Sequence, residues 1–159
     1  MSETPLDDHA RHELAANIDD WLVRARAELP AIVAVDRADP VDVGPSEHRW
    51  YVRLAGEDKD FTTIWLTLGQ RTLKYETYVM AWPEENTEML FENLLRRNER
   101  LTGCQFSIGI EDAVFLRGSV AVEGVSPAML DQIIGTLYVT VEQAFRSLLR
   151  IGFASRFRL

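Results

Sequence analysis

Apolar and polar residues alternate along residues 64–78, and the pair Gly69-Gln70 interrupts the alternation. An alternation of period two is typical of β-strands with one buried face, and a pair that begins with glycine suits a tight turn. With a two-residue loop, Leu66 lies opposite Leu73 on an apolar face of the ladder. The segment therefore predicts an antiparallel hairpin that turns one face toward the protein core.

Apolar residues recur at helical spacing in three other segments. Residues 5–29 form the first predicted helix, with Thr4 as its N-cap, and residues 30–46 form a connector rich in Asp, Pro and Gly. A second helix within 84–101 has acidic residues early and arginines late, which complements the helix dipole. The most regular apolar stripe, over 126–152, predicts a long third helix.

Three further segments, 47–54, 104–110 and 113–118, alternate like strands, and the connector can hold a short irregular strand near 32–35. A turn joins the second and third of these segments, which puts the phenylalanines of both on one face. The element order is α-β-β-β-α-β-β-α, and hairpins imply antiparallel pairing. The prediction is one α+β domain over residues 1–159, with an antiparallel sheet of about five strands packed against three helices.

Composition excludes several classes of partner. The chain has 159 residues and a formal net charge of −8. Phosphate backbones and anionic membrane surfaces repel an acidic protein, so we expect no nucleic acid and no membrane as partners. The first residues lack the pattern of a secretory signal and Cys104 is the lone cysteine, so we expect a cytoplasmic protein without disulfides. The basic and aromatic tail, 150–158, is expected to dock on the protein's own acidic body.

Few residues offer catalytic or metal-binding chemistry. His9 and His12 could contribute to a zinc site, but the polar first turn of a helix has the same sequence, and we expect no metal. Cys104 has no neighbouring histidine to act as a base and is expected to be a small buried side chain. The chain contains no glycine-rich nucleotide loop, P-loop or Gly-x-Ser-x-Gly motif. We therefore expect no cofactor and a protein that is not an enzyme.

The second face of the predicted hairpin collects aromatic side chains. Phe61, Trp65 and Tyr78 share it, with Phe61 opposite Tyr78 and Trp65 opposite Lys74, and Trp50 is expected nearby. An exposed aromatic surface of this kind is typical of protein contacts, so these five residues are the predicted protein-binding site. The alternative is that the face packs beneath the connector or a helix.

Four segments resemble the YbjN-domain family of bacterial proteins, which are described as sensory transduction regulators. They are residues 64–80, 94–98, 110–114 and 150–157, and the resemblance covers roughly residues 50–157. It implies a fold like that of type III secretion chaperones, in which helices pack on a twisted antiparallel sheet. Such chaperones are often homodimers that hold segments of client proteins. The family has no established catalytic residues that could be transferred to this chain.

Two classes of function remain open at this point. We prefer a non-enzymatic protein-binding module, a chaperone-like protein or regulatory adaptor that captures a peptide segment or a partner protein and forms a homodimer. The alternative is a small-molecule sensor or enzyme with a pocket between the sheet and the helices, using groups such as Lys74, Glu76 and His48. A third reading is a structural domain that only dimerises.

Overall fold

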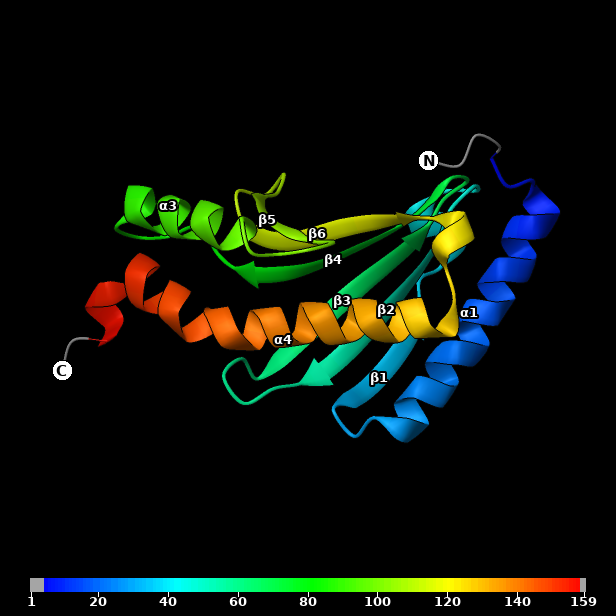
Figure 1. Ribbon diagram of the computed structural model, residues 1–159, viewed down its shortest axis with the longest axis horizontal. Coiled ribbons are helices and arrows are strands. Elements are labelled where there is room, and N and C mark those ends of the chain that lie inside the picture. Colours follow the sequence, from blue (N-terminus) through cyan, green and yellow to red (C-terminus); the bar gives the residue numbers. More distant parts are fainter. Residues whose placement is uncertain (1–4, 158–159) are drawn as a thin grey trace.

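The computed structural model describes residues 5–157 and shows helices packed on a single sheet (Figure 1). The α-helices of this part are α1 (Asp8–Glu28), α2 (Pro40–Val43), α3 (Thr87–Asn98) and α4 (Pro127–Gly152), and two 3-10 turns are η1 (Val122–Gly124) and η2 (Ala154–Phe157). The strands are β1 (Ile32–Arg37), β2 (His48–Ala55), β3 (Phe61–Leu68), β4 (Thr72–Met80), β5 (Gln105–Ile108) and β6 (Val114–Ala121). The predicted α+β class with an antiparallel sheet is confirmed.

The six strands lie in the order β1-β2-β3-β4-β6-β5, and every neighbouring pair is antiparallel. The chain leaves the sheet after β4 to form α3, and β6 returns beside β4, so β5 lies at one edge and β1 at the other. The long helix α4 crosses the sheet: in Figure 1, β5 and β6 lie on one side of the helix, and β2 and β3 pass behind it.

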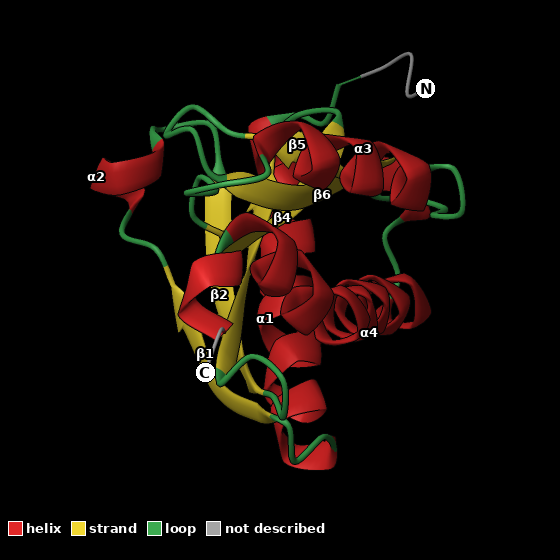
Figure 2. Ribbon diagram, turned by 90° about the vertical axis from the view of Figure 1, so that its left-hand side faces the viewer, coloured by secondary structure: helices red, strands yellow, loops and turns green. Residues whose placement is uncertain are grey.

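The helices cover the sheet unequally. Figure 2 shows α1 and α4 on one side of the strands and only the short α2 on the other. The side chains that point toward α4 are the apolar ones, and Ile64, Leu66 and Leu73 are completely buried, as are Leu137 and Val141 of α4. Burial of this continuous apolar surface is the main favourable contribution to the stability of the fold. We call this side of the sheet the covered face and the opposite side the outer face.

Local sequence signals explain where the helices begin. The Ser126 hydroxyl accepts a hydrogen bond of 3.1 Å from the backbone N–H of Met129, so the predicted start of α4 is confirmed. The first helix starts later than predicted, because the Asp7 carboxylate accepts from the backbone N–H of Ala10 at 2.8 Å and caps α1. Thr4, the predicted cap, lies outside the described residues.

The connector contains more structure than its composition indicates. The irregular strand predicted near 32–35 is β1, a full edge strand with a register shift between Ile32 and Ala34. It is followed by α2, where the Asp39 carboxylate accepts from the backbone N–H of Val41 at 3.0 Å. The sheet therefore has six strands rather than about five. Pro and Asp in this segment mark the ends of short elements rather than one long loop.

The hairpin of β3 and β4 forms with a register two residues away from the predicted one. Leu68 pairs with Leu73, and Leu66 pairs with Tyr75 rather than with Leu73. The chain reverses through residues 69–71, where the backbone N–H of Gly69 donates to the Thr72 carbonyl at 2.9 Å. A shift of two residues keeps every side chain on its face. The two faces were predicted correctly, and the cross-strand neighbours were not.

The turn between β2 and β3 is fastened to α4. The Glu142 carboxylate accepts hydrogen bonds from three consecutive backbone N–H groups, those of Glu57 and Asp58 at 3.0 Å and that of Lys59 at 3.3 Å. The Tyr138 hydroxyl donates to the Ala55 carbonyl at 2.7 Å. These bonds join the turn between the inner strands β2 and β3 to α4, so they fix the position of the residues that follow in β3.

Candidate functional site

The candidate site is the outer face of the sheet. Every second side chain of a strand points to the outer face, and cross-strand partners share a face, so the pairing of the strands identifies the residues that lie there. Three of its aromatic rings are exposed, with Trp65 at 37%, Phe61 at 44% and Tyr78 at 44% of their free surface. The outer-face residues of the four central strands are Arg49, Tyr51, Arg53, Ala55, Phe61, Thr63, Trp65, Thr67, Thr72, Lys74, Glu76, Tyr78, Phe115, Arg117, Ser119 and Ala121.

Arginines of β2 lie over aromatic rings of β3. The guanidinium carbon of Arg49 is 5.4 Å from the centroid of the Trp65 ring, and that of Arg53 is 3.9 Å from the centroid of the Phe61 ring. Tyr51 meets Trp65 edge to face with 5.6 Å between centroids. These arrangements are cation–π and aromatic contacts, which hold the side chains in fixed orientations at the surface.

The same pattern continues on β4 and β6. Tyr78 contacts Phe115 edge to face at 5.8 Å, and the guanidinium of Arg117 lies 4.6 Å from the centroid of the Phe115 ring. Arg117 Nε also forms an ion pair of 2.7 Å with Glu76, its partner across the ladder. The outer face therefore alternates aromatic rings with cations over four strands.

The structure brings four of the five predicted site residues onto this face. Phe61, Trp65, Lys74 and Tyr78 are there, but Trp65 lies opposite Glu76 and not opposite Lys74. The cation over the Trp65 ring is Arg49 of β2. Sequence reasoning placed Lys74 opposite Trp65 because it assumed a two-residue loop between β3 and β4.

The fifth predicted residue, Trp50, points into the covered face, and the expectation that it lies beside Trp65 is wrong. It pairs with Leu66 and is only 1% exposed. Its indole Nε1 donates to Asp19 of α1 at 2.6 Å. Because Tyr51 follows it in an alternating strand, Tyr51 occupies the outer face instead.

Sequence reasoning missed Phe115 as an outer-face residue. We expected the phenylalanines of β5 and β6 on one face, but Phe106 pairs with Leu116 and is buried, whereas Phe115 pairs with Ser107 on the outer face. The signal that could have located it is the alternation of Val114 and Leu116 on either side of Phe115.

The residues proposed for the small-molecule alternative do not come together. Lys74 and Glu76 lie on the outer face, whereas His48 lies on the covered face beside α1. His48 accepts a hydrogen bond of 2.6 Å at Nδ1 from Arg37, since a guanidinium can only donate. Partial burial, together with the positive charge of Arg37, lowers the pKa of His48. Arg37 also forms an ion pair of 2.8 Å with Asp19, so these side chains belong to the junction of the sheet with α1.

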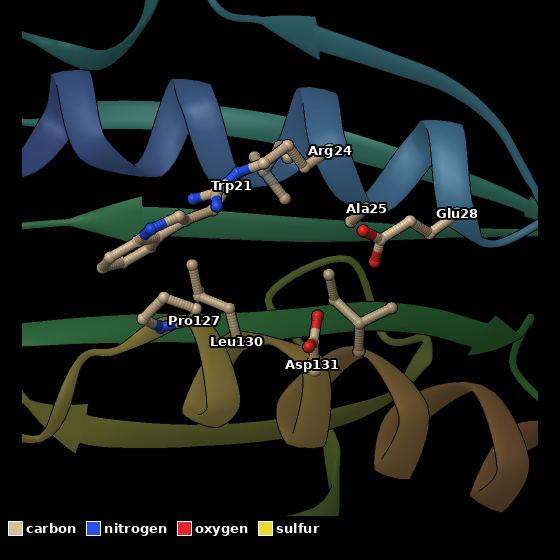
Figure 3. A pocket seen from close by; sticks show the side chains of 9 residues that line it. Trp21, Arg24, Ala25, Glu28, Pro127, Leu130 and Asp131 are labelled. Atoms are coloured by element: carbon tan, nitrogen blue, oxygen red, sulfur yellow. The ribbon is translucent and has the colours of Figure 1, made fainter.

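A small notch between α1 and α4 offers no alternative site. It measures about 90 Å³, which is well below the size of a typical ligand pocket, and Figure 3 shows Trp21, Arg24 and Glu28 of α1 facing Leu130 and Asp131 of α4 across it. Its charged side chains line the gap between the helices.

Cys104 lies beside a hollow of about 530 Å³ that the outer-face residues Lys74, Glu76 and Arg117 also line. Cys104 is a free, buried thiol, as expected, and burial raises its pKa. Among residues 5–157, no group of three or more His, Cys, Asp or Glu side chains is arranged to hold a metal ion. None of the helices in that range combines the length and apolar character needed to cross a membrane.

Comparison with known proteins places the chain in a family. The model of the YbjN family, described as "Putative bacterial sensory transduction regulator", matches residues 33–150. The chain belongs to the YbjN family. The matched region contains nearly all of α4 and all six strands, apart from the first residue of β1. The outer face therefore lies within the family domain.

Mycobacterial proteins are among the relatives of this YbjN-family chain. Uncharacterized protein Rv0487 of Mycobacterium tuberculosis is 33% identical over 104 residues, which are 65% of this chain and 57% of that protein. Uncharacterized protein ML2442 of Mycobacterium leprae is 31% identical over 107 residues, 67% of this chain and 58% of that protein. The chain thus spans less than two thirds of the length of these relatives.

Proposed function

We propose that this protein is a non-enzymatic regulatory module that captures an extended, acidic segment of a partner protein on the outer face of its sheet. The observation that carries the proposal is the open outer face itself, on which aromatic rings and cations alternate. The description of the YbjN family as regulators supports the same class of function. The homodimer implied by the chaperone-like fold stays a prediction.

The charge of the outer face favours an acidic partner. The chain as a whole has a formal net charge of −8. The outer-face residues of the four central strands nevertheless include one acid, Glu76, and four cations, Arg49, Arg53, Lys74 and Arg117. A local excess of positive charge on a negative protein attracts acidic groups and orients them as they approach. Acidic residues of the partner segment would therefore meet the arginines, and its apolar residues would meet the rings.

The side-chain composition favours a protein segment as the ligand. Aromatic residues and arginine are enriched at the centres of protein interfaces, where large, oriented side chains bury area at little entropic cost. Arg49 and Arg53 are already ordered against Trp65 and Phe61, so binding would immobilise few additional rotamers. Nucleic acid is the competing polyanion, and the net charge of the chain repels it over longer distances.

A displayed library of random peptides tests the proposal. We expect selection on the wild-type protein, with counter-selection on Trp65→Ala, to enrich peptides that combine Asp or Glu with apolar or aromatic residues. Calorimetry of a selected peptide should show a dissociation constant that rises at least about tenfold in Trp65→Ala, because truncation removes a ring that Arg49 and Tyr51 hold in place.

The matched control is Trp82→Ala, which removes a tryptophan that is 44% exposed outside the outer-face strands. Its peptide affinity should equal that of the wild type. Enrichment of basic peptides, equal loss of affinity in both variants, or tighter binding of an oligonucleotide of matched charge would each contradict the proposed function.

A further inference from the structure

A groove opens where β3 and β4 separate. Their pairing runs between 64–68 and 73–77, so the start of β3 and the end of β4 are not paired with each other. The groove has a volume of about 580 Å³ and is bordered by the end of β4, α4 and η2. Its apolar walls are formed mainly by Val79, Met80, Trp82, Phe145, Leu149 and Phe153. The side chains of Phe145 and Leu149 of α4 therefore line the groove beside the end of β4.

Lys59 provides a cation on the border of this groove. Its Nζ lies 5.7 Å from the centroid of the Tyr78 ring and 5.8 Å from that of the Phe145 ring, and it donates one hydrogen bond of 2.9 Å to the Phe61 carbonyl. Within residues 5–157, no carboxylate lies within ion-pair distance of Lys59. An ammonium has three donors, so two of them remain for a ligand.

The acidic residues near the groove are already engaged. Both carboxylate oxygens of Glu142 accept from backbone N–H groups of the β2–β3 turn. Glu84, on the border of the groove, forms an ion pair with Arg156 of η2. Glu142 is the acid whose charge acts on this half-buried ammonium, and its carboxylate is already bonded to the turn, so an anion that arrives with the ligand stabilises the ammonium further.

We infer that the groove at the β3–β4 split is a binding site for an amphipathic carboxylate, with the carboxylate on Lys59 and an apolar chain along the walls formed by β4, α4 and η2. This inference does not depend on the proposed function of the outer face. The volume of the groove falls in the range of small-molecule sites. The site combines an extended apolar surface with Lys59, a cation outside any ion pair among residues 5–157, and this combination is the complement of a fatty acid.

A peptide fits this groove less well than an acyl chain. A peptide backbone brings N–H and C=O groups that must find partners when water is removed. The ionic side chains of the groove are Lys59, Glu84 and Arg156, and the last two bind each other. An acyl chain has no polar groups along its length and leaves none unpaired.

Decanoate and decylamine, titrated below their micelle-forming concentrations, test the inference. They have similar chains and opposite head-group charges. By NMR of the full chain, decanoate should bind saturably and shift the signals of the Lys59 side chain and the Trp82 indole. Decylamine should show no saturable binding. The chain has only two lysines, Lys59 and Lys74, so lysine-labelled protein gives a simple spectrum.

Three variants locate the site. Lys59→Met should weaken decanoate binding at least about tenfold, while Lys74→Met, on the outer face, should leave it unchanged. Trp82→Ala should also weaken it, which keeps the test open if Lys59→Met is poorly folded. Equal binding of decanoate and decylamine, no saturable binding of decanoate, or wild-type affinity in folded Lys59→Met would overturn the inference. Loss of decanoate binding in Trp65→Ala is not expected, so the two sites can fail independently.

Discussion

The indole Nε1 of Trp50 donates a hydrogen bond of 2.6 Å to Oδ1 of Asp19. The other oxygen of that carboxylate, Oδ2, accepts from Arg37 Nη1 at 2.8 Å. One acidic side chain of α1 thus binds residues of β1 and β2 at once. The bond explains why a tryptophan occupies the covered face, because a buried indole N–H needs a partner.

Trp50→Phe should therefore destabilise the protein while leaving the outer face intact. We expect the free energy of unfolding to fall by about 2 kcal/mol, since the variant loses a hydrogen bond to a charged acceptor and part of a buried ring. Urea denaturation measures this. Trp82→Phe, at an exposed position, should change the free energy by less than about 0.5 kcal/mol. A Trp50→Phe protein as stable as the wild type would contradict the role of this bond.

Removal of the Glu142 carboxylate should loosen the turn between β2 and β3. We expect Glu142→Ala to lower the free energy of unfolding by about 2 kcal/mol, because three backbone N–H groups lose a charged acceptor. Amide hydrogen exchange at residues 57–59 should accelerate more than in the strands. Glu142→Gln keeps one acceptor oxygen, so its free energy of unfolding should lie between those of the wild type and Glu142→Ala. Unchanged exchange at these three amides would show that the carboxylate does not hold the turn.

The ammonium of Lys59 should titrate below its ordinary pKa of 10.5, chiefly because burial disfavours the charged form, while the charge of Glu142 partly offsets the effect. Between the folded pKa and 10.5, the unfolded chain binds more protons than the folded one, so the free energy of unfolding rises with pH in that window. Lysine NMR follows the titration directly. A pKa at or above 10.5 would contradict the burial of this group.

Substitutions on the outer face should separate stability from binding. Trp65→Ala is expected to cost only about 1 kcal/mol in unfolding free energy, since the ring is partly exposed and loses one cation–π and one aromatic contact. Binding of an acidic peptide should weaken with added salt, because the arginines are close enough to solvent to be screened. Salt-independent affinity would indicate that Arg49 and Arg53 do not contact the acidic groups.

Much of the fold could be predicted from local patterns. The stripe and cap of α4 and the alternation of β2, β3 and β4 are short-range signals, and the structure confirms the elements that they predict. The register of the β3–β4 hairpin was missed because it depends on the length of the loop after Leu68, and Gly69 suits both a two-residue and a longer turn. Edge strand β1 was underestimated because its alternation is interrupted by a bulge.

The candidate site could be predicted only in part. Phe61, Trp65 and Tyr78 were found because alternation separates the two faces of a hairpin. Trp50 was misplaced because its hydrogen-bond partner lies 31 residues away on α1, which no local pattern reveals. The groove beside Lys59 also depends on long-range packing, since the split of β3 from β4 and the position of α4 beneath it are tertiary features.

The most direct test of the central claim is NMR mapping of a selected acidic peptide on the isotope-labelled protein. The proposed function predicts shift changes concentrated at outer-face residues such as Arg53, Trp65 and Phe115, with few changes at exposed α1 and α4 residues such as Val23 and Val139. Changes confined to those helices or to the groove, with an unperturbed outer face, would contradict it.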